Sequence, residues 1–230
     1  MSNLVLWGHH LDEYQEMFDL TPAHLAGSVL EYASGPSAFN VEMHQAGNQC
    51  ISCDPMFTLD MDTFKTKSAL IFADMQEKVG HELDKFDFSH YGNFERLIEK
   101  RRAGMASFFA DYQLGKTEKR YLPTGEIALP FPDFSFDMAL SSHYLFGDID
   151  NLDVNFHIKI IKELARVAKE VRIFPLIDRE GQASPYLGPV LLELQHDNYG
   201  VEVRSVPYSL QSQGNAMLRV WAQECPLIYK

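Results

Sequence analysis

Two acidic residues, each at the end of a predicted strand, are the side chains best placed to bind a small polar molecule. Glu31 follows the apolar pair Val29 and Leu30, and a turn of small residues, 33–36, comes directly after it. Asp54 follows the short apolar segment 50–53. In a parallel α/β sheet such a turn presents backbone N–H groups to a ligand, and the second carboxylate accepts hydrogen bonds from two ribose hydroxyls. The spacing therefore predicts a nucleoside site.

The first half of the chain supplies the elements that would hold these carboxylates. Residues 11–25 predict one or two short helices, with Thr21 as an N-cap before Pro22. Residues 28–32 and 49–53 predict strands, and residues 36–46 predict the helix between them.

More than sixty residues separate Asp54 from the next predicted strand, near Tyr121, although a crossover needs only a dozen or two. Apolar spacing predicts one helix over 69–83 and another over 94–112, with Asn93 as N-cap and Gly115 past the end. We expect a single domain over 1–230. Residues 1–26 would contribute N-terminal helices, and residues 57–119 a helical insertion that caps the strand ends, with an aromatic loop at 86–92.

The second half returns to alternating strands and helices. Strands are predicted at 136–141 and 171–177, and helices at 156–168 and 187–196. Two final strands, 201–206 and 217–221, are joined by the turn 211–215. The pattern predicts a mostly parallel sheet that ends in a hairpin, so that one strand is antiparallel.

These residues resemble the class I S-adenosylmethionine-dependent methyltransferases. Glu31 matches the acid of the family's first motif, and Ala33, Gly35 and Ser37 match its three glycines. Residues 129–137, Leu-Pro-Phe-Pro-Asp-Phe-Ser-Phe-Asp, are very similar to the family's segment before the fourth strand. The resemblance implies a Rossmann-like α/β fold of three layers, with a seven-stranded, mostly parallel sheet whose last strand is antiparallel.

The resemblance also implies a cofactor, S-adenosylmethionine, with S-adenosylhomocysteine as product. Asp54 matches the carboxylate that holds the ribose hydroxyls, and His143 is the matched side chain that could act as a general base near neutral pH. The other expected cofactor contacts are Glu31, Tyr32, Ala33, Ser34, Gly35, Pro36, Pro55, Met56, Glu126, Ile127, Ser141 and Ser142.

The amino-acid composition argues against several classes of binding partner and cellular location. The net charge of −12 argues against a sequence-independent grip on nucleic acid. Residues 1–64 contain no Lys or Arg, which argues against a targeting peptide, and no apolar run suits a membrane span. Three cysteines indicate a reducing, cytoplasmic setting. Cys50 and Cys53 should lie on opposite faces of a strand, so no metal site is expected.

We therefore expect an enzyme, a methyltransferase with a small-molecule acceptor, acting as a monomer or homodimer. An alternative is a non-catalytic relative that binds the cofactor or its product as a regulatory or scaffold protein, because two motif glycines are replaced. An NAD-dependent oxidoreductase fits less well, because the turn lacks Gly-x-Gly-x-x-Gly. The basic run Lys100, Arg101 and Arg102 is expected on a solvated helix face.

Overall fold

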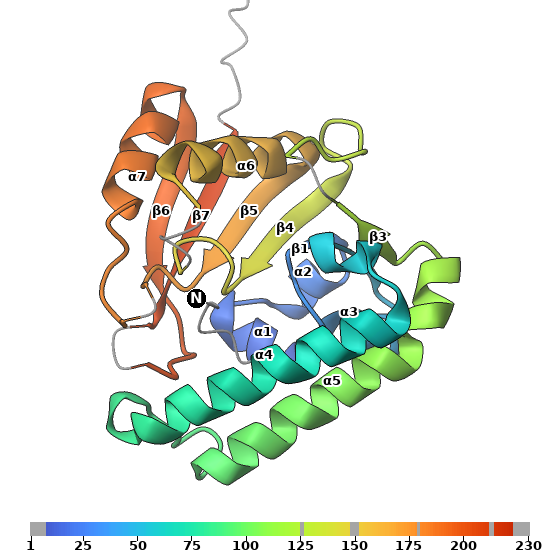
Figure 1. The fold of residues 1–230 in the computed structure, drawn as a ribbon. Coiled ribbons are helices and arrows are strands. Elements are labelled where there is room, and N and C mark those ends of the chain that lie inside the picture. The colour runs from blue at the N-terminus through green and yellow to red at the C-terminus, as the bar shows by residue number, and fades with distance from the viewer. Residues whose placement is uncertain (1–7, 125–126, 148–151, 179, 212–213, 223–230) are drawn as a thin grey trace, which may run out of the picture.

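A seven-stranded sheet between two layers of helices forms the centre of the molecule (Figure 1). The computed structural model describes residues 8–124, 127–147, 152–178, 180–211 and 214–222. The strands lie in the order β3-β2-β1-β4-β5-β7-β6. They are β1 (Ser28–Tyr32), β2 (Gln49–Asp54), β3 (Tyr121–Pro123), β4 (Phe136–Ser142), β5 (Ala168–Phe174), β6 (Tyr199–Ser205) and β7 (Ala216–Ala222).

The predicted Rossmann-like topology is confirmed by the pairing of the strands. β1 pairs in parallel with β2 and β4, β2 with β3, and β4 with β5. β7 is antiparallel to both of its neighbours, β5 and β6. The carboxyl ends of β1, β2 and β4 therefore meet at one edge, where open α/β sheets bind ligands.

Helices cover both faces of the sheet. They are α1 (Leu11–Met17), α2 (Pro22–Leu25), α3 (Phe39–Gln45), α4 (Met61–His81), α5 (Phe94–Thr117), α6 (Val154–Val167) and α7 (Leu187–His196), with 3₁₀ turns η1 (Pro55–Thr58) and η2 (Leu83–Lys85). One buried cluster joins a face of the sheet to side chains of α1, α3, α4 and α5. A second joins the opposite face to α6 and α7, and a third, smaller one lies between η1, α4, α5 and β3.

Strand alternation assigns neighbouring side chains to opposite faces. Val29 belongs to the first cluster and Leu30 to the second. Cys50 and Cys53 separate in the same way, as predicted, and both are free thiols. No group of metal-ligating side chains occurs in the part of the chain that the structure describes.

Helix boundaries follow their caps where the sequence marks them. Thr21, Asn93 and Asp153 each accept a backbone N–H at a helix start. The prediction for Gly115 was wrong: it lies inside α5, and a Cβ there would come 2.3 Å from the ring of Tyr121. Only glycine fits here, because the ring of Tyr121, in β3, packs directly on the backbone of α5.

Other boundaries also differ from the prediction, among them the start of α4, which lies at Met61 and not at residue 69. α3 begins at Phe39 and not at residue 36, because residues 33–38 form the turn after β1. β5 ends at Phe174 and not at residue 177, and Pro175 follows it without an amide hydrogen to extend the ladder.

The long insertion between β2 and β3 forms two antiparallel helices, α4 and α5, that lie side by side below the sheet in Figure 1. α5 packs on α3, and the connection between the two helices reaches the β6–β7 connection through a bridge between Phe86 and Gln211. This connection is one place where the segment between β2 and β3 meets the carboxyl edge of the sheet. None of the described helices combines the length and apolarity that a membrane crossing requires.

We expect Gly115→Ala to destabilise the fold, because its new methyl group would overlap the Tyr121 ring. Overpacking of this kind costs about 1–3 kcal/mol of unfolding free energy. Gly188→Ala in α7 is the matched control, since no atom of the described part of the chain lies within 4 Å of its Cβ position. The control should gain up to about 1 kcal/mol from helix propensity. Urea unfolding of both variants tests this, and equal stabilities would contradict it.

Candidate functional site

Asp54 closes β2 at the carboxyl edge and ties that edge together. Its Oδ2 accepts the N–H of Gly35 at 2.8 Å, in the turn after β1, and its Oδ1 accepts the N–H of Met56 at 2.7 Å. Burial raises the pKa of this carboxyl to about 6, although both N–H groups oppose the rise. Each carboxylate oxygen can accept a second hydrogen bond, so both can still receive a hydroxyl.

Glu31 is buried on the face covered by α1 and α3. Its Oε1 accepts the hydroxyl of Tyr14 at 2.6 Å, and its Oε2 accepts the hydroxyl of Ser52 from β2. Burial raises its pKa, which the two hydroxyls counteract. Tyr14 also stacks on Phe39, at 4.3 Å between ring centroids. Glu31 therefore holds α1 against β1 through Tyr14, and the Tyr14 ring in turn packs on α3.

The turn after β1 has two residues in the left-handed region, Ala33 at φ 55° and Gly35 at φ 56°. Glycine adopts this conformation freely, whereas alanine there is strained. The N–H of Ala33 donates to the Cys53 carbonyl at 2.7 Å, the N–H of Gly35 donates to Asp54, and Pro36 has none. The expected row of ligand-facing amides is thus largely engaged within the protein. The turn would hold a ligand mainly by shape and through Asp54.

The other predicted cofactor contacts that the structure describes lie at or after the ends of strands. Buried among them are Tyr32, at the end of β1, and Ser34, whose hydroxyl donates to the Gly35 carbonyl. Pro55 and Met56 open η1 directly after Asp54. Ile127 is half-buried beyond β3, and Glu126 lies outside the described residues.

Ser141, Ser142 and His143 end β4 beside β1. Ser141 is buried and its hydroxyl has no hydrogen-bond partner among the described residues, whereas the Ser142 hydroxyl lies 2.6 Å from Nδ1 of His143. Burial, and next the charge of Arg101, lower the pKa of His143 to about 3. The imidazole is therefore neutral across the physiological range and is a weak base.

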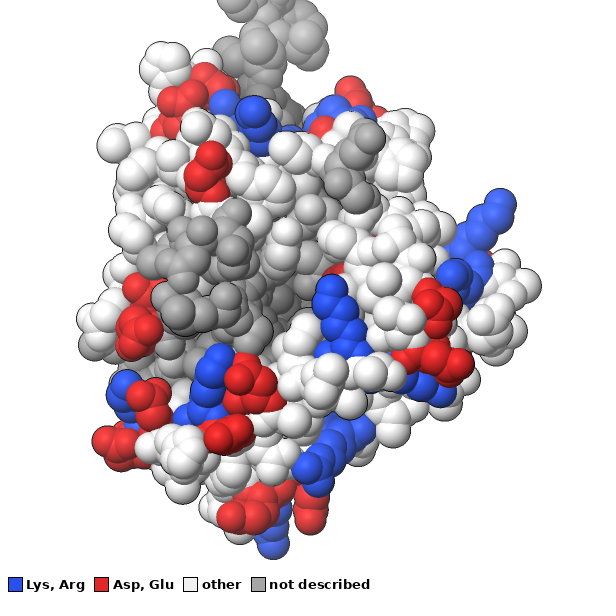
Figure 2. Space-filling view, viewed as in Figure 1, with Lys and Arg blue, Asp and Glu red and all other residues white. Residues whose placement is uncertain are grey.

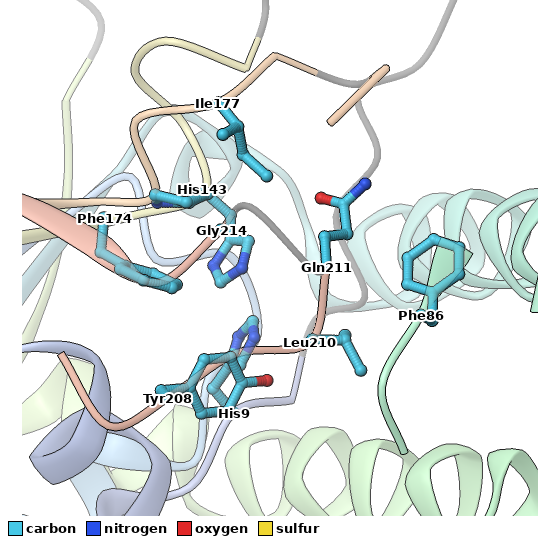
Figure 3. Close-up of a pocket in the computed structure, with 10 residues that line it drawn as sticks. His9, Phe86, His143, Phe174, Ile177, Tyr208, Leu210, Gln211 and Gly214 are labelled. Atoms are coloured by element: carbon cyan, nitrogen blue, oxygen red, sulfur yellow. The ribbon is translucent and has the colours of Figure 1, made fainter. Parts of the chain in front are cut away.

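A pocket opens next to His143, at the carboxyl ends of β4 and β5 (Figure 3). Its polar lining residues are His9, His143, Tyr208 and Gln211, and its main apolar ones are Phe86, Phe174, Pro175, Ile177 and Leu210. Figure 2 shows the face seen in Figure 1, where many charged side chains lie toward the periphery and one Lys or Arg side chain lies beside a hollow near the centre. We call the pocket lined by the residues above the His9–His143 pocket.

A buried ion pair stands behind the pocket. Arg101 of α5 and Glu13 of α1 are bonded and their side chains are fully buried. Arg101 also donates to the hydroxyl oxygens of Tyr91 and Tyr208, at 3.2 and 3.0 Å. Although burial alone would raise the pKa of Glu13, the guanidinium holds it below its usual value. The prediction of a solvated basic run was thus wrong for Arg101, because α5 turns this one side chain toward Glu13.

Most residues of the pocket carried no signal in the sequence. His9 lies before the predicted helical residues 11–25, and Phe174, Tyr208 and Gln211 lie in or beyond strands that sequence patterns predict without assigning them a function. Of the aromatic loop, Phe86 lines the pocket, whereas the hydroxyl of Tyr91 is engaged by Glu13 and Tyr208.

No family model matches the chain. The uncharacterized protein MJ0045 of Methanocaldococcus jannaschii is 27% identical over 219 residues, 95% of this chain and 96% of that protein. Among solved structures, a SAM dependent methyltransferase from Aquifex aeolicus is similar with a TM-score of 0.43, 17% identity and coverage of 91% and 92% of the two chains. Magnesium protoporphyrin IX methyltransferase from Synechocystis, with bound SAM, is similar with a TM-score of 0.47, 10% identity and coverage of 87% and 73%. At TM-scores below 0.5, the fold rests on this chain's own strand order.

We expect Arg101→Met to lower the unfolding free energy by about 3–5 kcal/mol, because it leaves the carboxylate of Glu13 buried without its partner. The neighbouring pair of Lys100 and Asp12 is partly exposed, so Lys100→Met should cost no more than about 1 kcal/mol. Urea unfolding at neutral pH measures both. Similar losses in the two variants would contradict the assignment of Arg101 as the buried partner.

Proposed function

We propose that this protein is an S-adenosylmethionine-dependent methyltransferase that acts on a small-molecule acceptor. The observation that carries the proposal is the position of Asp54: it ends β2, beside β1, and bonds to the turn that follows Glu31. The strand order, with β7 antiparallel, is the one the family resemblance implies.

The residues at this edge fit a nucleoside through its ribose. Asp54 has unused acceptor capacity on both oxygens, and the left-handed turn at Gly35 lies against it. Lys67 of α4 is close enough to lower the pKa of Asp54 slightly, against the larger effect of burial. Glu31 bonds to the hydroxyls of Tyr14 and Ser52, so its role would be to hold α1 and β2 against β1.

The donor would supply an activated methyl group on its sulfonium sulfur. The protein would hold the acceptor atom in line with that methyl group. Alignment of the reacting atoms at about 3–3.5 Å provides much of the acceleration in such transfers. His143, with a pKa of about 3, would orient an acceptor by hydrogen bonding and would remove protons poorly. A general base is therefore not assigned.

The cysteines and the net charge bear on the compartment and the kind of acceptor. We propose a reducing, cytoplasmic compartment, because Cys50 and Cys53 are buried free thiols. The net charge of −12 favours a small acceptor over a polyanion. We further propose that residues 57–119 are an insertion in one domain formed by the whole chain, which would act as a monomer or homodimer.

Thermal unfolding with S-adenosylmethionine, S-adenosylhomocysteine, NAD and ATP tests the cofactor. A ligand at about 100 times its Kd adds about 2.7 kcal/mol of stability, or roughly 5–10 °C in Tm for a chain of this size. We expect shifts with the two sulfur nucleosides only. A shift with NAD alone, or no shift, would overturn the proposal, and binding without methyl transfer to any acceptor would favour a regulatory relative.

Asp54→Asn should abolish the shift with S-adenosylhomocysteine. The variant keeps one amide oxygen but leaves a second backbone N–H without its acceptor, which costs about 1–3 kcal/mol and leaves the protein folded. Asp84→Asn, an exposed aspartate in η2, is the matched control and should keep the full shift. A ligand shift retained by the Asp54 variant would refute the assignment of the ribose contact.

Binding of S-adenosylhomocysteine should weaken as the pH falls through about 6, the pKa of Asp54. The ionised carboxylate accepts the ribose hydroxyls, so affinity should be constant above this pH and fall by up to tenfold for each unit below it. Without ligand the sign is reversed: the folded pKa lies above the unfolded value, so this group's contribution to stability falls as the pH rises from about 4 to 6. Calorimetric titration from pH 5 to 8 measures the first effect.

A further inference from the structure

The His9–His143 pocket has flat, uncharged walls. The rings of His9 and His143 are stacked, 4.6 Å between centroids and 16° from parallel. Phe174 packs in T-shaped contacts with both His143 and Tyr208, at 5.5 and 5.7 Å between ring centroids. In Figure 3 these rings form one side of the pocket, and Gln211, Leu210 and Phe86 form the other. Walls of this kind favour a flat aromatic ligand, because ring faces and edges pack well against one another.

The pocket carries no formal charge on its described lining residues, since none of them is Asp, Glu, Lys or Arg. Burial lowers the pKa of His9 well below its usual value, and that of His143 to about 3, so both rings are neutral. Arg101 lies behind them but is paired with Glu13. An ionised ligand would lose its hydration here without gaining a counter-ion, which disfavours acidic and strongly basic acceptors.

Hydrogen bonds outside the pocket fix its walls. The hydroxyl of Tyr208 accepts from Arg101 and lies 2.7 Å from that of Tyr91. The backbone N–H of His143 donates to the carbonyl of Phe174 at 2.7 Å. The enclosed cavity between these walls is small, about 30 Å³, and the rest of the hollow is open to solvent. A ligand would therefore lie partly in the open mouth of the pocket, against walls that are already fixed.

The pocket adjoins the proposed donor site through His9. The carbonyl of His9 accepts the N–H of Ala38 at 2.9 Å and the hydroxyl of Ser37 at 3.3 Å, in the turn after β1, while its ring lines the pocket. His143 approaches from the end of β4, next to β1. A ligand in the pocket would therefore lie beside a donor held by Asp54 and the turn.

We propose that the His9–His143 pocket binds the methyl acceptor, and that this acceptor is a neutral, planar nitrogen heteroaromatic compound of one or two rings. The inference rests on the proposed function, because it assigns an acceptor to the same reaction. The aromatic rings provide the packing surface, and the imidazoles and the Gln211 amide provide polar contacts at the ligand's edge.

The chemistry is consistent with the weak basicity of the two histidines. A ring nitrogen with a free lone pair forms the new nitrogen–methyl bond as the sulfur–methyl bond breaks, and that electron pair stays on sulfur. The positive charge moves from sulfur to nitrogen and no proton has to be removed. Methylation of such an acceptor therefore requires that its ring nitrogen be aligned with the methyl group, and it requires no general base.

Calorimetric titration at pH 7.5 with quinoline, and with quinoline-2-carboxylate as the charged counterpart, tests the proposal in the presence of S-adenosylhomocysteine. We expect quinoline to bind at least tenfold more tightly than the carboxylate. Leu210→Trp would fill the pocket and should weaken quinoline binding at least tenfold. Leu192→Trp, on an exposed position of α7, is the matched control and should leave it unchanged.

The Tm shift with S-adenosylhomocysteine separates the two proposals and reports folding of each variant. Leu210→Trp should keep this shift, and Gln211→Trp serves as a second pocket-filling variant. If the nucleoside binds but quinoline does not, or if both pocket variants bind quinoline normally, the acceptor assignment is wrong. Preference for the carboxylate would also overturn it. If the nucleoside itself causes no shift, the proposed function fails first.

Discussion

A buried carboxylate is stable only when its oxygens are hydrogen-bonded, and two such groups organise the carboxyl edge of this sheet. Asp54 joins the end of β2 to the turn after β1 and to the start of η1. Glu31 joins β1 to Tyr14 of α1 and to Ser52 of β2. Each one makes a strand end, a turn and a helix mutually dependent, so the shape of the proposed donor site is set by these few bonds.

The pair of Arg101 and Glu13 extends this organisation to the rest of the chain. It connects the long insertion to the N-terminal helix, and through Tyr91 and Tyr208 it reaches the segment between β6 and β7. Burying two charges is costly, and the arrangement is stable only while both partners are present. The consequence is that three segments distant in sequence form one wall, against which the His9–His143 pocket lies.

The two sites differ in their electrostatics. The proposed donor edge has an acidic group, Asp54, whose pKa is raised to about 6, whereas the adjoining pocket is lined by neutral rings. A cationic sulfonium would be accommodated between a carboxylate edge and an uncharged acceptor. The division suits a reaction in which positive charge is transferred and no proton transfer has to be catalysed.

The sequence alone determined the strands, their order along the chain and the place of Asp54, because alternation, caps such as Asn93 and a carboxylate after an apolar strand are local signals. It could not determine that Arg101 is buried or that Gly115 lies under Tyr121, since both depend on partners from other segments. Nor could it find His9, which lines the pocket only because the segment before α1 packs against His143 at the end of β4. Such contacts join residues far apart in the chain, and local periodicity carries no information about them.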